Sequence, residues 1–571
     1  MAPDASGLSV TADPSLPPEG YRIEIGADGA VHVAAADESG SFYAAATLAQ
    51  LERVCGGRLP VGTVEDWPDV ALRGVMLDVS RCKVPTLETL FELVDRLASW
   101  KVNHLELYME HTFAYPGHDE VWRGADPFDA ADIAALDAFC RARHVELVAN
   151  QNCLGHMERW LVHDRYSALG ISSGVVSGPL GMPMAASTLD PTNPGSLALV
   201  GELLAALGAA LPGRRLHVGL DEPWDLPTDR SGQWRSWLDR LRALPATAGR
   251  ELLVWGDMLA LHPELAEGLP DDVTVCEWGY EANHPFSSRA AGLAALGVRH
   301  LLSPGTSSWL SVLGRTTNAV DNCRAAADAG AASGAAGLLV TDWGDFGHLQ
   351  YLPVSDPGLA AAAATAWCLE TNRDLDAARL ARLLDQHCYG DSAGALGSAL
   401  VALGDAHLLQ PGVVPNVSGL VLHLYFPQLA IGRGFGEDIT PDDVDAVDSA
   451  LDGAVRGLAA ARPDTAHGRL ATEEMAVAAR LVRLLCRDTR ARITGDGSLA
   501  GLPPALRTEL ADELDDLVAD HRTRWLERNR PGGLDESCRW LTHLRDCYRA
   551  GEADLDWAGP LVERIRSRAA P

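Results

Sequence analysis

The sequence has few positive charges for its size. Its 571 residues include 47 Lys and Arg against 78 Asp and Glu, and the formal net charge is −31. A field of this sign repels phosphates and anionic headgroups over about one Debye length, ~8 Å. The charge balance therefore argues against nucleic acid or a membrane surface as a partner and favours an uncharged substrate.

Long apolar runs and paired cysteines are also missing. No segment approaches the roughly 18 consecutive apolar residues of a membrane span, and residues 1–20 lack a basic stretch followed by an apolar one. We therefore expect a cytoplasmic protein. The 11 cysteines include no CxxC pair, and no set of His, Asp and Glu has metal-ligand spacing. We expect no disulfide framework, no metal and no cofactor.

The two ends of the chain differ in pattern from its middle. Within residues 1–67, alternating runs at 21–25 and 31–35, a Gly-Ser break and a helical pattern at 41–54 predict a small α/β domain. Residues 373–571 are rich in Ala, Leu, Arg and Glu at helical spacing, which predicts a C-terminal helical domain. This domain could also carry the contact surface of a homodimer.

The middle of the chain, residues 68–372, alternates short apolar runs with helical stretches. The eight runs are LRGVMLDV, VNHLELYM, HVELVAN, RLHVGL, ELLVW, VTVCEW, VRHLL and GLLVT. A helix between successive strands forces parallel pairing, and eight such units close a (β/α)8 TIM barrel. In the first unit, Thr86 can cap a helix with Leu87, Leu90, Val94 and Leu97 on one face.

Functional side chains follow most of the predicted strands. In such a barrel the active site lies at the carboxyl ends of the strands. The residues there are Arg81; Glu110 and His111; Asn150, Asn152 and His156; Asp221 and Glu222; Trp255 and Asp257; Glu277 and Trp278; and Asp342, Trp343 and Asp345. Charged groups can bind hydroxyls, and indoles can pack on C–H faces. This combination suits a sugar.

The pair Asp221-Glu222 is one of five Asp-Glu dipeptides, and only this one directly follows an apolar strand run. Glycoside cleavage needs a carboxylic acid that is protonated near neutral pH, which burial and a neighbouring carboxylate produce by raising its pKa. Glu222 has the longer reach and is the predicted proton donor. In a retaining enzyme with two catalytic carboxylates, the second lies about 5–5.5 Å from the acid and attacks the anomeric carbon from the opposite face. Asp221 is adjacent to Glu222 in the chain and cannot easily do this. The seventh strand loop, residues 303–318, offers no acid. We therefore expect the 2-acetamido group of the substrate to attack, with Asp221 orienting it.

Four segments resemble glycoside hydrolase family 20, the β-N-acetylhexosaminidases. They are RGVMLDVSR (73–81), CLGHMERW (153–160), LHVGLDE (216–222) and TDWGD (341–345). In order and spacing the likeness covers about 300 residues, and a helix near the N-terminus resembles the small domain that precedes that family's barrel. One departure is Leu220, because the family usually has a second glycine before its acidic pair.

The resemblance implies a role for each matching residue. It makes Glu222 the general acid/base and Asp221 the residue that orients the acetamido group. Arg81 and Asp345 would bind sugar hydroxyls, and His156 would join the hydrogen-bond network near the acid. The tryptophans expected to wall the pocket are Trp255, Trp278 and Trp343.

Two further departures concern binding residues. Strand two ends in Glu110, within YMEHTFAY, where the family has an acidic pair. The family also holds the acetamido oxygen with a tyrosine near strand seven, and residues 298–320 contain none. Tyr280 or Trp309 could take its place. If neither does, the requirement for a 2-acetamido group is itself in doubt, and Glu110 or Glu277 becomes a candidate for a different role in the site.

The leading hypothesis is an exo-acting, retaining hydrolase that removes a terminal β-linked N-acetylglucosamine or N-acetylgalactosamine from an oligosaccharide or glycoconjugate. A second is a glycosidase of the same fold for a sugar without the acetamido group. A third is a sugar-binding protein without catalysis. Long loops at 110–127 and 153–195 are expected to roof the pocket.

Overall fold

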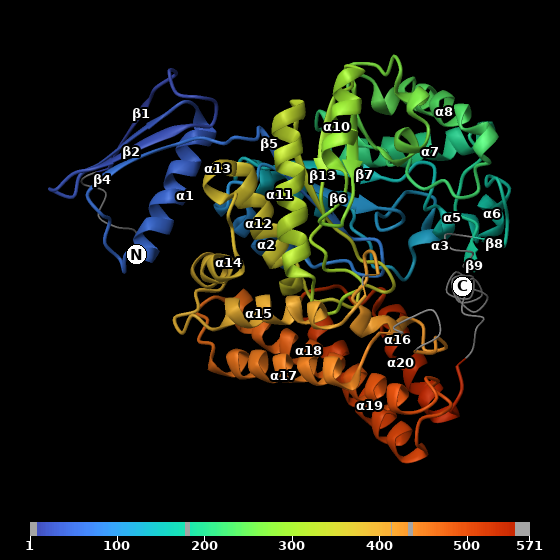
Figure 1. The fold of residues 1–571 in the computed structure, drawn as a ribbon. Coiled ribbons are helices and arrows are strands. Elements are labelled where there is room, and N and C mark those ends of the chain that lie inside the picture. Colours follow the sequence, from blue (N-terminus) through green and yellow to red (C-terminus); the bar gives the residue numbers. More distant parts are fainter. Residues whose placement is uncertain (1–7, 178–182, 413, 432–437, 554–571) are drawn as a thin grey trace.

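The protein folds into three parts that follow one another along the chain (Figure 1). This computed structural model describes residues 8–177, 183–412, 414–431 and 438–553. A small sheet comes first, a closed barrel follows, and a group of helices lies below the barrel in Figure 1. The predicted α/β barrel with its N-terminal α/β domain and C-terminal helical domain is confirmed. The exact boundaries at 67/68 and 372/373 stay predictions.

The N-terminal part is a four-stranded sheet covered by one helix. Its elements are β1 (Leu8–Ala12), β2 (Tyr21–Ile25), β3 (Val31–Ala35), α1 (Glu38–Val54) and β4 (Gly62–Asp66), with the strands in the order β1-β3-β2-β4. Tyr21, Ile23 and Ile25 are buried, and the residues between them point the other way. The sequence did not predict β1 and β4, because both are largely exposed and lack this alternation. The predicted Gly-Ser break is wrong, since α1 begins at Glu38 and runs through it.

The middle of the chain forms a closed barrel of parallel strands. They are β5 (Leu72–Asp78), β6 (His104–Met109), β7 (Glu146–Gln151), β10 (Arg215–His217), β11 (Glu251–Trp255), β12 (Val273–Trp278), β13 (His300–Ser303) and β14 (Gly337–Asp342). β14 pairs with β5 from Gly337↔Leu72 to Asp342↔Leu77, which closes the ring. Each strand matches one predicted run. Nearly all of their residues are buried, because helices cover the outside of the barrel.

Helices alternate with these strands. They are α2 (Leu87–Ser99), α3 (Asp119–Trp122), α4 (Ala130–Arg141), α5 (Glu158–Leu161), α6 (Asp164–Ser167), α7 (Pro194–Ala210), α8 (Gly232–Arg242), α9 (Asp257–Leu261), α10 (Phe286–Ala295), α11 (Thr316–Ser333) and α12 (Asp356–Trp367). Thr86 caps α2 by accepting a hydrogen bond from Thr89 N at 3.2 Å, as predicted. The loop predicted at 153–195 holds α5, α6 and the hairpin β8 (Val175–Ser177) and β9 (Pro183–Ala185). Its residues 178–182 lie outside the described residues.

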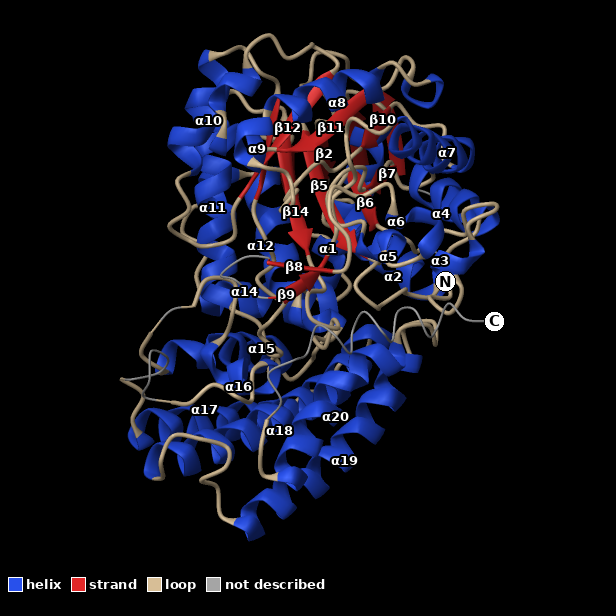
Figure 2. Cartoon of the chain, turned by 90° about the vertical axis from the view of Figure 1, so that its right-hand side faces the viewer, coloured by secondary structure: helices blue, strands red, loops and turns tan. Residues whose placement is uncertain are grey.

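The C-terminal helices lie against the carboxyl ends of the barrel strands (Figure 2). They are α14 (Ala377–Leu384), α15 (Leu396–Asp405), α16 (Leu422–Tyr425), α17 (Pro441–Ala460), α18 (Ala466–Thr494), α19 (Pro504–Leu526) and α20 (Leu534–Ala550). The short helix α13 (Leu369–Asn372) links α12 to them and lies at the other end of the barrel, where Leu369 N donates to Asp69 at 2.7 Å. Contacts such as Tyr351 with His521, and Arg159 with Glu536, join this region to loops that follow barrel strands. A homodimer through these helices stays a prediction.

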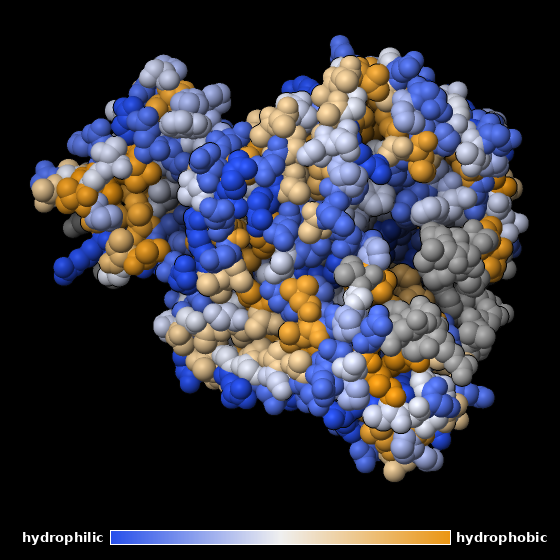
Figure 3. Space-filling model, viewed as in Figure 1, coloured by the Kyte–Doolittle hydropathy of each residue, from blue (hydrophilic) through white to orange (hydrophobic). Residues whose placement is uncertain are grey.

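The surface is mixed in character. Figure 3 shows a largely hydrophilic face on which apolar residues gather in separate patches. Across the described residues, we find no helix that combines the length and the apolarity needed to cross a bilayer.

Candidate active site

The acidic pair lies on a sharply bent segment that follows the shortest barrel strand. β10 ends at His217, and Gly219, Leu220 and Glu222 then adopt positive φ angles of 69°, 74° and 46°. Such angles are rare for residues other than glycine and cost about 1–3 kcal/mol each. Leu220 keeps this conformation with its side chain fully buried, and its carbonyl accepts a hydrogen bond from Trp234 Nε1 at 2.9 Å. The surrounding packing thus holds Leu220 in the conformation that a glycine would adopt freely.

One histidine contacts both carboxylates of the pair. His156 Nε2 lies 3.3 Å from Asp221 Oδ2 and 3.4 Å from Glu222 Oε2. Asp221 is buried and accepts a hydrogen bond from Asn152 Nδ2 at 2.9 Å, whereas the Glu222 side chain is 29% exposed. Burial alone raises the pKa of Asp221, but His156 outweighs it and holds that pKa below the usual range. Asp221 is therefore a charged acceptor, and Glu222 is the member of the pair that solvent and ligands can reach.

A third carboxylate supports this turn. Asp257, directly after β11, accepts a hydrogen bond from the backbone N–H of Glu222 at 3.0 Å. Burial and the neighbouring charge of Asp221 raise the pKa of Asp257 to about 7. Close carboxylates in a buried site cannot all ionise easily, so this group loses its proton only near neutral pH.

Arg81 is surrounded by acidic and aromatic side chains. Its guanidinium lies 3.0 Å from Asp78 and 3.3 Å from Glu110, and its Nε lies 3.8 Å from Asp345 Oδ1. The rings of Tyr108 and Trp343 are 4.8 and 4.9 Å from its central carbon. These contacts fix the arginine between several binding groups.

Arg81 also connects this group to the acidic pair, since its Nη2 is 3.4 Å from His156 Nδ1. Burial lowers the pKa of His156, but the carboxylates of Asp221 and Glu222 outweigh burial and raise it well above its usual value. The structure therefore joins the two predicted carboxylates, the histidine and the arginine in one network.

The predicted tryptophans form one aromatic wall through Tyr280. Trp255 and Trp343 have ring centroids 5.8 Å apart, and Trp343 Nε1 donates a hydrogen bond to the Tyr280 hydroxyl at 2.8 Å. Tyr280 stacks on Trp278 at 5.1 Å and meets the edge of Trp309 at 5.0 Å. Tyr280, which follows β12, thus links Trp343 to Trp278 and Trp309.

Other strand-end residues lie away from this network. Asp342 accepts hydrogen bonds from the hydroxyls of three residues, Thr306, Ser308 and Ser355. Asn150 donates to Glu106 inside the barrel at 2.9 Å. Glu277 lies 3.3 Å from His284 and 3.5 Å from Arg289, which makes it a structural ion-pair partner. The position of Glu277 therefore does not support the hypothesis that it has a different role in the site.

Tyr108 belongs to the network and was not singled out from the sequence. Its hydroxyl donates to Glu110 Oε1 at 3.0 Å and accepts from Asn152 Nδ2 at 3.2 Å. Because strand residues two apart point to the same side, its position two residues before Glu110 could have indicated this.

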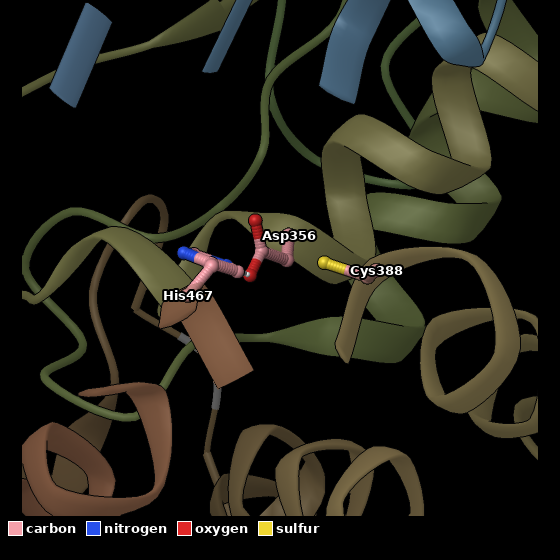
Figure 4. Close-up of side chains that lie close together, drawn as sticks. All are labelled: Asp356, Cys388 and His467. Carbon is pink, nitrogen blue, oxygen red and sulfur yellow. Dashed lines mark hydrogen bonds and ion pairs between the residues drawn. The ribbon is translucent and has the colours of Figure 1, made fainter. Parts of the chain in front are cut away.

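One cluster of side chains has the spacing of metal ligands in the described part of the chain. Asp356, Cys388 and His467 are buried together where α12, the π-helical turn Asp385–Tyr389 after α14, and α18 meet (Figure 4). However, His467 Nε2 lies 2.6 Å from Asp356 Oδ2, too close for two ligands of one tetrahedral ion, and the Arg96 guanidinium lies 3.3 Å from Oδ1. The donors therefore fit a hydrogen-bonded ion cluster, with arginine as its cation.

Comparison with known proteins gives matches to one family. Residues 2–67 match the model of glycosyl hydrolase family 20, domain 2, and residues 71–327 match the family 20 catalytic domain. A β-N-acetylhexosaminidase from Cellulomonas fimi is 23% identical over 329 residues, 54% of this chain and 63% of that protein. Hexosaminidase D from Homo sapiens is 29% identical over 233 residues, 37% of this chain and 45% of that protein. The chain thus matches less than two thirds of the length of these relatives.

Solved structures share the fold. A family 20 β-N-acetylhexosaminidase from Streptomyces coelicolor matches with a TM-score of 0.51 and 22% identity, over 66% of this chain and 83% of that one. A second family 20 structure, a β-N-acetylglucosaminidase, gives a TM-score of 0.53 at 22% identity, over 64% of this chain and 84% of that one.

Proposed function

Because this chain belongs to glycoside hydrolase family 20, we propose that it removes a terminal β-linked N-acetylglucosamine or N-acetylgalactosamine from an oligosaccharide or glycoconjugate. The observation that carries the proposal is the pairing of Asp221 and Glu222 on one imidazole nitrogen, at 3.3 and 3.4 Å. Both carboxylates thereby approach a substrate from one side, next to an arginine and an aromatic wall.

The reaction assigns a separate task to each carboxylate. Glu222 gives its proton to the glycosidic oxygen while the acetamido oxygen of the substrate bonds to C1, and the C1–O bond to the leaving group breaks. Water then attacks C1 of the oxazolinium intermediate, Glu222 takes a proton from it, and the bond to the amide oxygen breaks. Two displacements at C1 retain the β configuration. The ionised Asp221 accepts the amide N–H, which orients the amide oxygen and stabilises the positive charge of the intermediate.

Tyr280 is the residue that we assign to the acetamido oxygen. Its oxygen accepts the hydrogen bond from Trp343 Nε1, so its own O–H can donate to a ligand. Burial raises the pKa of Tyr280 well above its usual value, which keeps this proton in place. A donor to the amide oxygen steers it toward C1. Tyr280 thus compensates for the tyrosine that the seventh strand loop lacks.

A panel of chromogenic aryl β-glycosides tests the proposal. We expect hydrolysis of the β-N-acetylglucosaminide or β-N-acetylgalactosaminide, with the β anomer as the first product seen by proton NMR. The matched 2-hydroxy glycosides should turn over far more slowly, because they cannot form the oxazolinium intermediate. Faster cleavage of a 2-hydroxy glycoside would instead establish the same-fold glycosidase for a sugar without the acetamido group.

A further inference from the structure

The C-terminal helices lie beyond residue 327, where the family model of the catalytic domain ends. We propose that one piece of them, the docking segment Arg528–Trp540, is a positioning element of the active site. It fixes the loops that carry Arg81, His156 and Asp345. The inference rests on the proposed function for the roles of these three residues, and on the following contacts for the docking itself.

The docking segment first pairs by its backbone with the loop that follows β5. Thr86 N donates to Arg528 O at 2.9 Å, and Arg530 N donates to Val84 O at 2.8 Å. These two hydrogen bonds form a short antiparallel bridge between the C-terminal region and the loop of Arg81. Backbone hydrogen bonds of this kind fix the position of one chain segment relative to another.

Two glycines then bring the segment into direct backbone contact with the barrel loops. A Cβ at Gly533 would lie 1.8 Å from Cys82 O, and one at Gly532 would lie 2.3 Å from Ala125 O. No side chain fits at either distance. Because Cys82 directly follows Arg81, the position of Gly533 determines how closely α20 supports that arginine.

An ion pair ties the segment to a second loop. Glu536, in the first turn of α20, contacts Arg159 through both oxygens, at 3.1 and 2.5 Å. The two side chains are only 12% and 16% exposed, and the arginine holds the pKa of Glu536 down at about 2. Arg159 lies three residues after His156, so this buried pair anchors the loop whose histidine contacts the acidic pair.

Aromatic packing ties the segment to the loop after β14. Trp540 lies 5.3 Å from the ring of Phe346, measured between centroids. Its ring also fills the space beside Gly347, where a Cβ would lie 2.4 Å from the indole. Phe346 directly follows Asp345, so α20 packs against the loop segment that carries this acid.

One segment of the C-terminal region therefore contacts the loops of three predicted binding residues. Arg81 meets Asp345 at 3.8 Å and His156 at 3.4 Å, and both distances span separate loops. A misplacement of about 1 Å in such a constellation can cost about a hundredfold in rate. The docking segment makes these loops one rigid unit.

The sharpest test compares the glycines at the two ends of α20. Gly533 and Gly551 both have φ of 78°, so alanine brings the same backbone strain to each. Gly533→Ala also drives a methyl group into Cys82 O, whereas at Gly551 the new Cβ meets only the mobile end of Arg507. In the full chain, we expect Gly533→Ala to raise KM for the aryl N-acetylhexosaminide at least tenfold and to lower kcat/KM about a hundredfold. Gly551→Ala should keep the wild-type KM.

A second pair of variants isolates the ion pair. Glu536→Gln keeps the shape but leaves Arg159 without its counter-charge, and we expect kcat to fall at least tenfold with a displaced pH profile as the His156 loop shifts. Asp535→Asn is the control, because the neighbouring carboxylate is 68% exposed and pairs with Arg522 within the C-terminal helices. A purely structural defect lowers the amount of active enzyme, which scales the maximal rate and moves neither KM nor the pH profile.

Wild-type KM in Gly533→Ala and a wild-type pH profile in Glu536→Gln would overturn the inference. If the wild-type protein cleaves no aryl N-acetylhexosaminide, the proposed function fails, and hydrogen–deuterium exchange decides the docking separately. We expect faster exchange in residues 80–86 and 154–160 of Gly533→Ala than of Gly551→Ala. Equal exchange in those loops counts against the positioning role whatever the protein cleaves.

Discussion

The active site and the junction between the barrel and the C-terminal helices both bury charged side chains, but they balance them differently. At the junction, Asp356 lies 3.3 Å from Arg96 and 2.6 Å from His467, and it accepts a hydrogen bond from Tyr389 at 2.9 Å. These partners outweigh burial and hold the pKa of Asp356 below its usual range. Burial lowers the pKa of His467 to about 4, so the histidine is neutral. One carboxylate is matched by one guanidinium.

In the active site the carboxylates outnumber the cations. Arg81 lies against the three carboxylates of Asp78, Glu110 and Asp345. Burial raises the pKa of Glu110 to about 7, and burial with the charge of Asp221 does the same for Asp257. Several groups here therefore titrate in the range where an acid catalyst works.

This contrast separates structural buried charge from reactive buried charge. A matched pair is costly to break but does no chemistry, because its protonation state is fixed across the physiological range. An unmatched group keeps a shifted pKa and remains free to exchange protons with a ligand. Substitutions in the two clusters test this distinction.

The largest effect is expected at the pair itself. Glu222→Gln removes the proton that the leaving group needs, and we expect kcat to fall by about 10²–10⁴. The Glu222 side chain is 29% exposed, so the midpoint of urea unfolding should not move. Steady-state kinetics with an aryl glycoside and far-UV circular dichroism measure the two quantities. Wild-type turnover in this variant would remove Glu222 from the mechanism.

For the junction cluster we expect the opposite outcome, a loss of stability without a loss of activity. Asp356→Asn leaves Arg96 buried without its counter-charge, which should cost about 3–5 kcal/mol of unfolding free energy. KM and kcat of the folded enzyme should stay near the wild-type values. Asp328→Asn is the matched control, because its pair with Arg373 is exposed and is expected to contribute less than about 1 kcal/mol. Urea titration of the three proteins separates these cases, and equal midpoints would contradict a stabilising role for Asp356.

Local pattern was enough to predict the barrel and to propose where its active site lies. The apolar runs gave all eight strands, because strands buried on both faces are apolar throughout. The rule that the active site follows the strands then selected Asp221-Glu222 from five identical dipeptides. The same rule also included Glu277 and Asp342, since sequence position does not reveal which neighbours satisfy a carboxylate.

What the sequence could not predict depends on contacts between distant residues. The ion pair of Arg159 and Glu536 joins positions 377 residues apart, and no local pattern relates them. The left-handed backbone of Leu220 is imposed by packing, against the residue's own preference. The docking at Gly533 needs the position of Cys82, which only the folded chain supplies.

A smaller effect is expected from removing one tyrosine hydroxyl in the active site and one at the junction. Tyr280→Phe deletes the donor that we propose for the acetamido oxygen, and we expect kcat/KM to fall about 10- to 100-fold, or about 1.4–2.7 kcal/mol. Tyr389→Phe deletes the hydroxyl that donates to Asp356, and it should lower stability by about 1 kcal/mol with no change in kcat/KM. Kinetics and urea unfolding of both variants test the contrast, and an unchanged kcat/KM in Tyr280→Phe would assign the acetamido oxygen to another residue.

The last effect concerns pH and Asp257. In the unfolded chain this carboxyl loses its proton near 3.8, whereas in the folded protein its pKa is about 7. Between these values the folded state holds the additional proton, so the contribution of Asp257 to stability falls as pH rises from about 4 to about 7. Asp257→Asn cannot titrate, yet its amide oxygen can still accept the Glu222 N–H. The stability of this variant relative to wild type should therefore increase with pH across that window, by at most about 1.4 kcal/mol per pH unit. Glu110 titrates in both proteins and cancels in the difference. Parallel stability curves would mean that the surplus of carboxylates imposes no cost on folding, and the two clusters would then not differ in the way their contacts indicate.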